Sequence, residues 1–82
     1  MYRDFKTRYK VFIEFNQNRL CEEEVNLIVK ENFDEEVLKF KGFKLELLWE
    51  VPEREGSHEI DNELYYILED GEYGSYSYEF ID

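Results

Sequence analysis

Cys21 and His58 are the residues whose chemistry could serve nucleophilic catalysis, since the chain contains one cysteine and one histidine. A thiol becomes a strong nucleophile when an imidazole or a helix N-terminus lowers its pKa. His58, however, stands in a Gly-Ser-His-Glu loop, and Cys21 falls on the apolar stripe of an expected helix, where a small buried side chain fits. We therefore predict no catalytic residue and no enzyme. An enzyme that uses Cys21 or His58 is kept as a third class of function, after the two binding classes described below.

Oxygen ligands for a metal ion are clustered at Glu69-Asp70-Gly71-Glu72. This cluster lacks the alternating ligand spacing and the distal glutamate of a calcium-binding EF-hand loop. Paired carboxylates suit glycoside hydrolysis, but 82 residues leave little room for a sugar-binding cleft. The sequence also has no glycine-rich phosphate loop. We predict neither a metal site nor a cofactor.

The most distinctive chemistry lies in residues 55–82, which hold nine carboxylates, five of the seven tyrosines and no lysine or arginine. This segment supplies nine of the eleven units of negative formal charge. Aromatic and acidic side chains without cations of their own are suited to meet a basic partner. The carboxylates would speed association, and the tyrosines would supply desolvated contact. The predicted partner-binding residues are Glu63, Tyr65, Glu69, Asp70, Glu72, Tyr73 and Glu79.

In charge, size and Tyr-plus-acid content, the chain resembles small acidic inhibitors from phages and mobile elements, which include DNA-mimic proteins and the immunity proteins that neutralise nuclease toxins. The resemblance implies a stoichiometric inhibitor that occludes a basic, nucleic-acid-binding surface of a target protein. Carboxylates at alternate strand positions lie about 6.8 Å apart, which permits phosphate mimicry but holds for any strand with one polar side.

The alternative function is a structural interaction module or a homodimer. An exposed aromatic and aliphatic sheet face, including Phe12, Leu48 and Ile67, would then pair with another sheet, and the acidity would only maintain solubility.

Size and composition exclude several other classes. Eighty-two residues suffice for a single domain, residues 1–82, and an aromatic content of 18% indicates a folded chain. A net charge of −11 disfavours direct binding to nucleic acid or to anionic membranes. One cysteine permits no intramolecular disulfide, and the basic N-terminus is followed by no signal-peptide apolar region. The expected location is the cytoplasm of a bacterial or host cell.

The elements that would position these residues follow from hydrophobic periodicity. Alternation predicts a strand at Tyr9–Phe15, and three- and four-residue spacing predicts a helix that ends near Asn32, with Asn18 as its expected cap. A second strand is predicted at Phe43–Val51; Gly42 is either a bulge or the turn of a hairpin whose first arm is Val37–Lys41.

After Pro52 we expect an exposed loop to Asn62 and then a C-terminal hairpin, residues 63–69 and 73–81. A loop of three or five residues around Asp70 and Gly71 would align the apolar sides of its two arms. The predicted fold class is α+β: a small single-layer, antiparallel-dominated sheet of about four strands with one helix packed on one face, in the order β-α-β-β-β.

This arrangement assigns each side chain to a face of the sheet. The side under the helix would carry Val11, Ile13, Leu45, Leu47, Trp49, Leu64, Tyr66, Tyr76 and Tyr78. The open side would carry Phe12, Leu48, Tyr65, Ile67, Tyr73 and Ile81 among Glu14, Glu46, Glu50, Glu63, Glu69 and Glu79.

Overall fold

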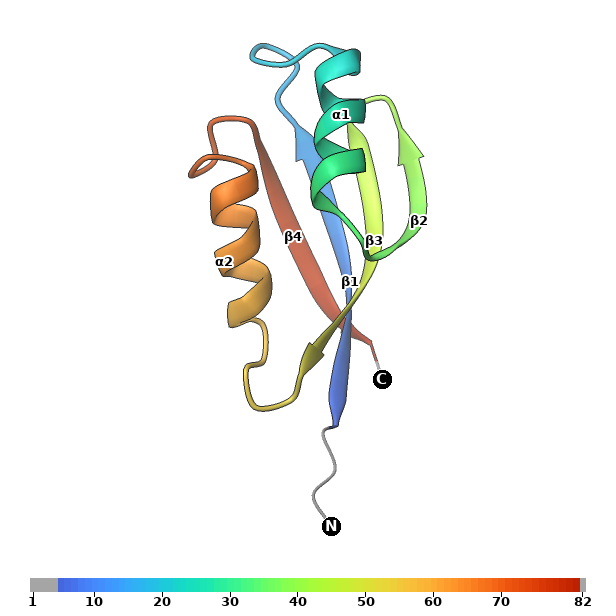
Figure 1. The fold of residues 1–82 in the computed structure, drawn as a ribbon, viewed down its shortest axis with the longest axis vertical. Helices are drawn as coiled ribbons and strands as arrows, with labels where there is room; N and C mark the ends of the chain where they lie inside the picture. The colour runs from blue at the N-terminus through green and yellow to red at the C-terminus, as the bar shows by residue number, and fades with distance from the viewer. Residues whose placement is uncertain (1–4, 82) are drawn as a thin grey trace.

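The structure is a computed structural model that describes residues 5–81. Four strands and two helices follow one another along the chain (Figure 1). Their bounds are β1 Lys6–Phe15, α1 Glu22–Asn32, β2 Glu36–Lys41, β3 Lys44–Pro52, α2 His58–Ile67 and β4 Gly74–Ile81.

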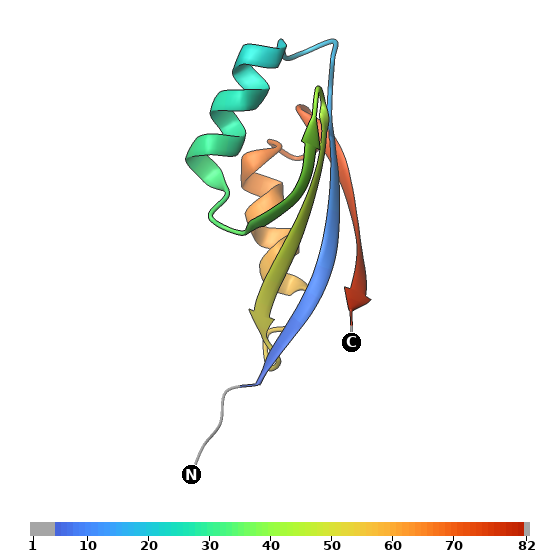
Figure 2. The ribbon, with the colours of Figure 1, turned by 90° about the vertical axis from the view of Figure 1, so that its right-hand side faces the viewer.

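The strands form one open antiparallel sheet in the order β2-β3-β1-β4. Both helices lie on the same face of this sheet, so the other face is open (Figure 2). Because β2 and β1 both pair antiparallel with β3, they run parallel to each other on either side of it. This β-α-β-β-α-β connectivity is the split β-α-β, or ferredoxin-like, arrangement. The predicted α+β class and the small antiparallel sheet are confirmed.

The predicted loop to Asn62, the first arm of the predicted C-terminal hairpin and the single helix are wrong, because residues 58–67 form a second helix, α2, and the order is therefore not β-α-β-β-β. Leu64 and Leu68 are buried in either interpretation, since a spacing of four residues returns to the same side of a helix and of a strand. Tyr66, which lies between them, distinguishes the two interpretations. A strand would place Tyr66 on the same side as the two leucines, whereas it is 79% exposed, as a helix requires. Ile60 and Ile67 complete the helical spacing that the sequence contained.

The strand faces were predicted correctly for β1, β3 and β4. Val11 is opposite Leu47 on one side and Tyr78 on the other, and all three lie on the helix-covered face. Phe12, two strand positions from Glu14, lies on the open face with Leu48 and Ile81. The predicted hairpin had also placed residues 64–67 on these two faces, but they belong to α2. Tyr73, predicted to lie on the open face, precedes β4.

Gly42 is the turn of the β2–β3 hairpin, with φ +60°, a conformation that glycine adopts without strain. The pairing of the two strands shifts in register between Val37 and Lys39, so the irregularity of this hairpin lies in β2. Of the two alternatives left open by the sequence, the structure has the turn.

The helix α1 is capped by Cys21 rather than by Asn18. The Cys21 amide donates a 3.1 Å hydrogen bond to Oε1 of Glu24, and this bond lowers the pKa of the Glu24 carboxyl. Cys21 is exposed, so the prediction of a buried thiol is wrong. Asn18 instead belongs to the preceding turn, where its amide donates to Oδ1 of Asn16.

The core lies between the central strands and the two helices. It is built from alternate residues of β1 and β3 and from helix residues at intervals of four, and burial of their apolar surface stabilises the fold by roughly 25 cal/mol per Å². Its buried members are Val11, Ile13, Phe15, Leu20, Val25, Val29, Phe33, Leu45, Leu47, Trp49, Val51, Ile60, Leu64 and Leu68.

Candidate protein-binding surface

Asp61 of α2 joins the helix to the edge strand β4. Its Oδ1 accepts a 2.6 Å hydrogen bond from the Tyr76 hydroxyl, and its Oδ2 accepts one of 3.2 Å from the Tyr78 hydroxyl. The two tyrosine rings are stacked, with centroids 6.2 Å apart. Partial burial and the carboxylate of Asp61 raise the pKa of Tyr76 to about 12. One carboxylate thus fixes two tyrosines of a separate element.

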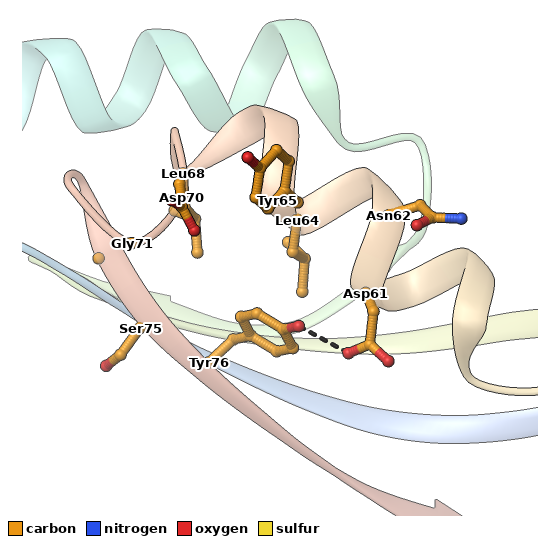
Figure 3. A pocket seen from close by; sticks show the side chains of 10 residues that line it. Asp61, Asn62, Leu64, Tyr65, Leu68, Asp70, Gly71, Ser75 and Tyr76 are labelled. Atoms are coloured by element: carbon orange, nitrogen blue, oxygen red, sulfur yellow. Dashed lines mark hydrogen bonds between the residues drawn. The ribbon is translucent and has the colours of Figure 1, made fainter.

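A groove of about 590 Å³ runs between α2 and β4 (Figure 3). Tyr76 contributes apolar surface to it above the fully buried Leu64, and Asp61 and Asp70 contribute carboxylates. Tyr65 borders it from α2 and is 54% exposed. The groove therefore offers aromatic contact beside negative charge.

The connection from α2 to β4 has an unusual backbone. Glu69, Asp70 and Gly71 all have positive φ values, of 48°, 55° and 87°. The left-handed conformation costs a non-glycine residue roughly 1–2 kcal/mol, so two of these three residues are strained. The turn is held by backbone hydrogen bonds from Asp70 to Tyr65 and from Tyr73 to Leu68. Its effect is to present the carboxylates of Glu69 and Asp70 at the end of α2.

The seven predicted partner-binding residues occupy several places. Tyr65 and Asp70 lie together at the groove, with Glu69 in the strained turn beside them. Glu63 points to the other flank of α2, close enough to Glu35 for their charges to interact.

The remaining three, Glu72, Tyr73 and Glu79, each lie beside another group of the same chain, so they are less available to a partner. Glu72 forms a 3.5 Å ion pair with Arg19. Tyr73 is half-buried against the core. Glu79 stands opposite Lys10 on the open face of the sheet.

Two residues that the sequence did not assign to binding belong to this surface. Asp61 holds Tyr76 and Tyr78, and Tyr66 is the most exposed of the large apolar and aromatic side chains in residues 5–81. The rings of Tyr65 and Tyr66 meet edge to face, with centroids 5.7 Å apart. A helical interpretation of the apolar residues from 60 to 68 would have placed both tyrosines outward, but it would not have paired Asp61 with β4.

Charge is segregated between the two sides of the molecule. Of the ten lysines and arginines, Arg3 lies outside the described residues, and six of the other nine point from the open face of the sheet. Five carboxylates of the described strands share that face. The cations are Lys6, Arg8, Lys10, Lys39, Lys41 and Lys44, and the carboxylates are Glu14, Glu36, Glu46, Glu50 and Glu79.

The opposite side, formed by α1, α2 and the connections joined to them, is here called the helical side. Two of the 21 acidic residues, Asp4 and Asp82, lie outside the described part, so the helical side carries the remaining fourteen. Its cations are Arg19, Lys30 and Arg54. Carboxylates therefore outnumber cations by eleven on the helical side, whereas the open face of the described strands carries one more cation than carboxylates.

Like charges are crowded around Glu35, which lies in the connection from α1 to β2. Burial raises the pKa of the Glu35 carboxyl, and the neighbouring charges of Asp34 and Glu63 raise it further. Oε2 of Glu35 is buried without a hydrogen-bond partner. The helical side is thus strongly anionic at this point as well.

The candidate nucleophilic and metal-binding residues of the described chain do not come together in one place. Cys21 caps the start of α1 and His58 begins α2, and these two helix starts lie at opposite ends of the molecule (Figure 1). Within residues 5–81, no group of three or more His, Cys, Asp and Glu side chains is arranged to hold a metal ion. Neither helix of the described chain has the length and apolar character needed to cross a bilayer.

Comparison with known proteins adds no relative: no protein-family model, no curated protein and no solved structure matches this chain. The connectivity of the sheet is shared by proteins of many functions, so it does not indicate one.

Proposed function

We propose that this chain is a small, non-enzymatic inhibitor that binds a basic surface of a target protein through its helical side, and so blocks that surface from nucleic acid. The observation that carries the proposal is the charge segregation: fourteen carboxylates against three cations on the helical side. A field of one sign that extends over a whole side attracts a surface of the opposite sign and accelerates association.

Exposed aromatic groups supply the second element of a protein interface. Tyr65 and Tyr66 are 54% and 79% exposed on α2, among the carboxylates of Glu63, Glu69 and Asp70. Tyrosine is enriched at the energetically dominant positions of interfaces, because it buries a large area with few rotatable bonds. In this proposal the carboxylates attract the target and the two tyrosines hold it.

The open sheet face suits nucleic acid poorly. Proteins that bind RNA on a four-stranded sheet stack bases on several aromatic side chains. Among the strand residues of the described chain, Phe12 is the one aromatic group on this face, and the Lys10 ammonium lies 5.3 Å from its ring centroid. Five carboxylates are interleaved with the cations, which supports a protein rather than a nucleic acid as the partner.

The test is affinity capture from a lysate of the source cells, at about 50 mM and about 500 mM salt, followed by identification of the captured protein. We expect a basic protein that is captured at low salt, is lost at high salt and is displaced by double-stranded DNA. Capture that does not depend on salt, or a partner that DNA does not displace, would contradict the proposal.

Matched variants locate the contact. Glu63→Gln with Glu69→Gln removes two charges from the helical side, and Glu14→Gln with Glu50→Gln removes two from the open face. We expect the first pair to slow association with the captured protein several-fold and the second pair to leave it nearly unchanged. Equal effects of the two pairs would remove the assignment to the helical side.

A second candidate function is a homodimer formed through the open sheet face. It is favoured by the near balance of charge there, six cations against five carboxylates around Phe12 and Leu48, which is a self-complementary pattern. In that case sedimentation should show a dimer, and Leu48→Glu should dissociate it while Glu63→Gln should not.

A further inference from the structure

Among residues 5–81, no strand pairs with the outer edge of β4, which therefore presents a row of unpaired backbone hydrogen-bonding groups. In an antiparallel pair, alternate residues direct their amide and carbonyl groups toward the partner strand. The Asn16 amide donates to the Tyr73 carbonyl at 2.8 Å, which fixes this alternation. Ser75, Ser77 and Glu79 therefore bond to β1, and the backbone groups of Tyr76, Tyr78 and Phe80 point outward from the sheet.

This edge lacks the features that usually protect an edge strand. Proteins block such edges with lysines, prolines, bulges or a covering element. β4 has no lysine, arginine or proline, and its pairing with β1 is regular over all eight residues. The other edge strand, β2, has Lys39, Lys41 and a shift in register. The two edges of the sheet are thus unequal, and β4 is the one open to pairing.

The groove beside β4 indicates what kind of strand would pair. A strand added to this edge would direct alternate side chains into the groove, toward the carboxylates of Asp61 and Asp70 and the ring of Tyr65. At the far end of the strand it would meet the ring of Phe80, which is 63% exposed. Cationic side chains at every second position, alternating with apolar or small ones, match these surroundings.

A second copy of the chain matches them poorly. Pairing of two β4 strands would bring together two anionic α2 helices from chains that each carry a net charge of −11. The resulting repulsion opposes such a dimer. Charge complementarity therefore selects a basic segment over a second copy.

We infer that the edge of β4, together with the groove under α2, binds an extended, Lys- or Arg-bearing segment of the partner protein as a fifth strand of the sheet. The inference rests on the proposed function, because it specifies how the basic partner is held. The backbone of Tyr76, Tyr78 and Phe80 would give the affinity of a strand pair, and Asp61 and Asp70 would give the preference for cations.

The test uses the full chain and a synthetic probe, an acetylated and amidated octapeptide of alternating arginine and valine. Amide hydrogen exchange is measured residue by residue with and without the peptide. We expect exchange at Tyr76, Tyr78 and Phe80 to slow by about tenfold or more, because new hydrogen bonds protect these amides. Exchange at Ser75, Ser77 and Glu79 should change little, since β1 already protects them.

Two controls separate strand pairing from simple charge attraction. A peptide of the same charge with proline at a central valine position should bind more weakly and should not protect the three amides. Phe80→Pro removes an outward amide together with the ring, and Phe80→Ala removes the ring alone. We expect the proline variant to bind the peptide at least about fivefold more weakly than the alanine variant, the value of one hydrogen bond.

Several outcomes would overturn the inference. The first is that the peptide does not bind. The second is that the peptide binds but leaves the amides of Tyr76, Tyr78 and Phe80 unprotected. The third is that protection of these amides rises with protein concentration in the absence of peptide, which would indicate pairing with a second copy. The second of these leaves the proposed function standing if the binding depends on salt. Failure of the proposed function is recognised separately, as the absence of salt-sensitive capture from the lysate.

Discussion

The Tyr76 hydroxyl donates a 2.6 Å hydrogen bond to Oδ1 of Asp61, and this bond connects the edge strand β4 to α2 across 15 residues of sequence. It is accompanied by the longer bond from Tyr78 to the same carboxylate. The acidic, tyrosine-rich segment is therefore partly engaged with itself. Tyr76 lines the groove and Tyr78 is held by the same carboxylate, whereas Tyr65 and Tyr66 remain exposed.

The pKa of Tyr76 predicts a loss of stability in alkali. Burial and Asp61 raise the pKa of Tyr76 to about 12 in the folded chain, whereas an unfolded tyrosine titrates near about 10. The unfolded state then loses its proton first, so this contribution to stability is complete below about pH 10 and is lost as the pH rises toward 12.

Chemical denaturation across this pH range, compared with that of Tyr76→Phe, measures the effect. At neutral pH we expect Tyr76→Phe to lower the free energy of unfolding by about 1 kcal/mol, the value of one hydrogen bond. Between pH 10 and 12 the gap between the two proteins should narrow. A gap that stays constant over this range would show that Tyr76 titrates alike in the folded and unfolded states.

Substitutions in α2 distinguish the helix from a strand. Leu64→Ala should lower the free energy of unfolding by about 2–5 kcal/mol, because Leu64 is fully buried. Tyr66→Ala should change it by less than about 0.5 kcal/mol, because the side chain is mostly exposed. Thermal or urea unfolding of both variants provides the measurement. Comparable destabilisation by the two substitutions would argue for a shared inward face, as in a strand.

Two glycines flanking the α2–β4 turn should respond to alanine for different reasons. A Cβ at Gly74 would lie 2.5 Å from the backbone oxygen of Glu14, so Gly74→Ala forces the strands β1 and β4 apart. We expect a loss of more than about 2 kcal/mol. Gly71→Ala meets nothing closer than 3.9 Å but has φ +87°, so its cost is conformational, about 1–2 kcal/mol.

Gly56→Ala is the matched control for the conformational cost, since Gly56 has φ +57° and a Cβ added there would meet no atom within 4 Å beyond its chain neighbours. Equilibrium unfolding of the three variants should rank Gly74→Ala as the least stable. If Gly74→Ala were as stable as Gly56→Ala, the close approach of β4 to β1 at this position would be disproved.

At Glu35, removal of a negative charge should stabilise the fold. Burial, Asp34 and Glu63 raise the pKa of the Glu35 carboxyl in the folded state, so its ionisation at neutral pH opposes folding. Glu35→Gln should raise the free energy of unfolding at pH 7 by less than about 1 kcal/mol. The gain should vanish as the pH falls below the ordinary range for glutamate, where both states are protonated.

The control for Glu35 is Glu36→Gln, because Glu36 is its neighbour in sequence but is exposed on the open sheet face. Urea unfolding at pH 7 and at about pH 4 compares the two. A similar gain from both substitutions would indicate a general effect of net charge rather than the local burial of Glu35.

Much of the sheet could be predicted from the sequence because a strand has a short, local period. Val11 and Phe12 had to face opposite sides, and the same holds for Leu47 and Leu48, whatever the strand order. The excess of carboxylates after residue 55 is likewise a property of composition alone. The strand faces depend on neighbours two positions away and the charge depends on composition, so neither prediction needed a tertiary contact.

Three features depended on tertiary structure. Residues 64–68 by themselves place leucines on one side in either a helix or a strand, and burial of Ile60 and Leu64 in the core selects α2. The pairing of Asp61 with Tyr76 joins residues from separate elements, and local spacing does not encode it.

The segregation of charge is the third. The cations of β1, β2 and β3 reach a common face only when these strands lie side by side, and the carboxylates of α1 and α2 then face the other way. The sequence alone determined how acidic this protein is, because net charge is a sum over residues. The tertiary structure decided where that charge lies and which tyrosines accompany it, because position in space depends on which elements pack together.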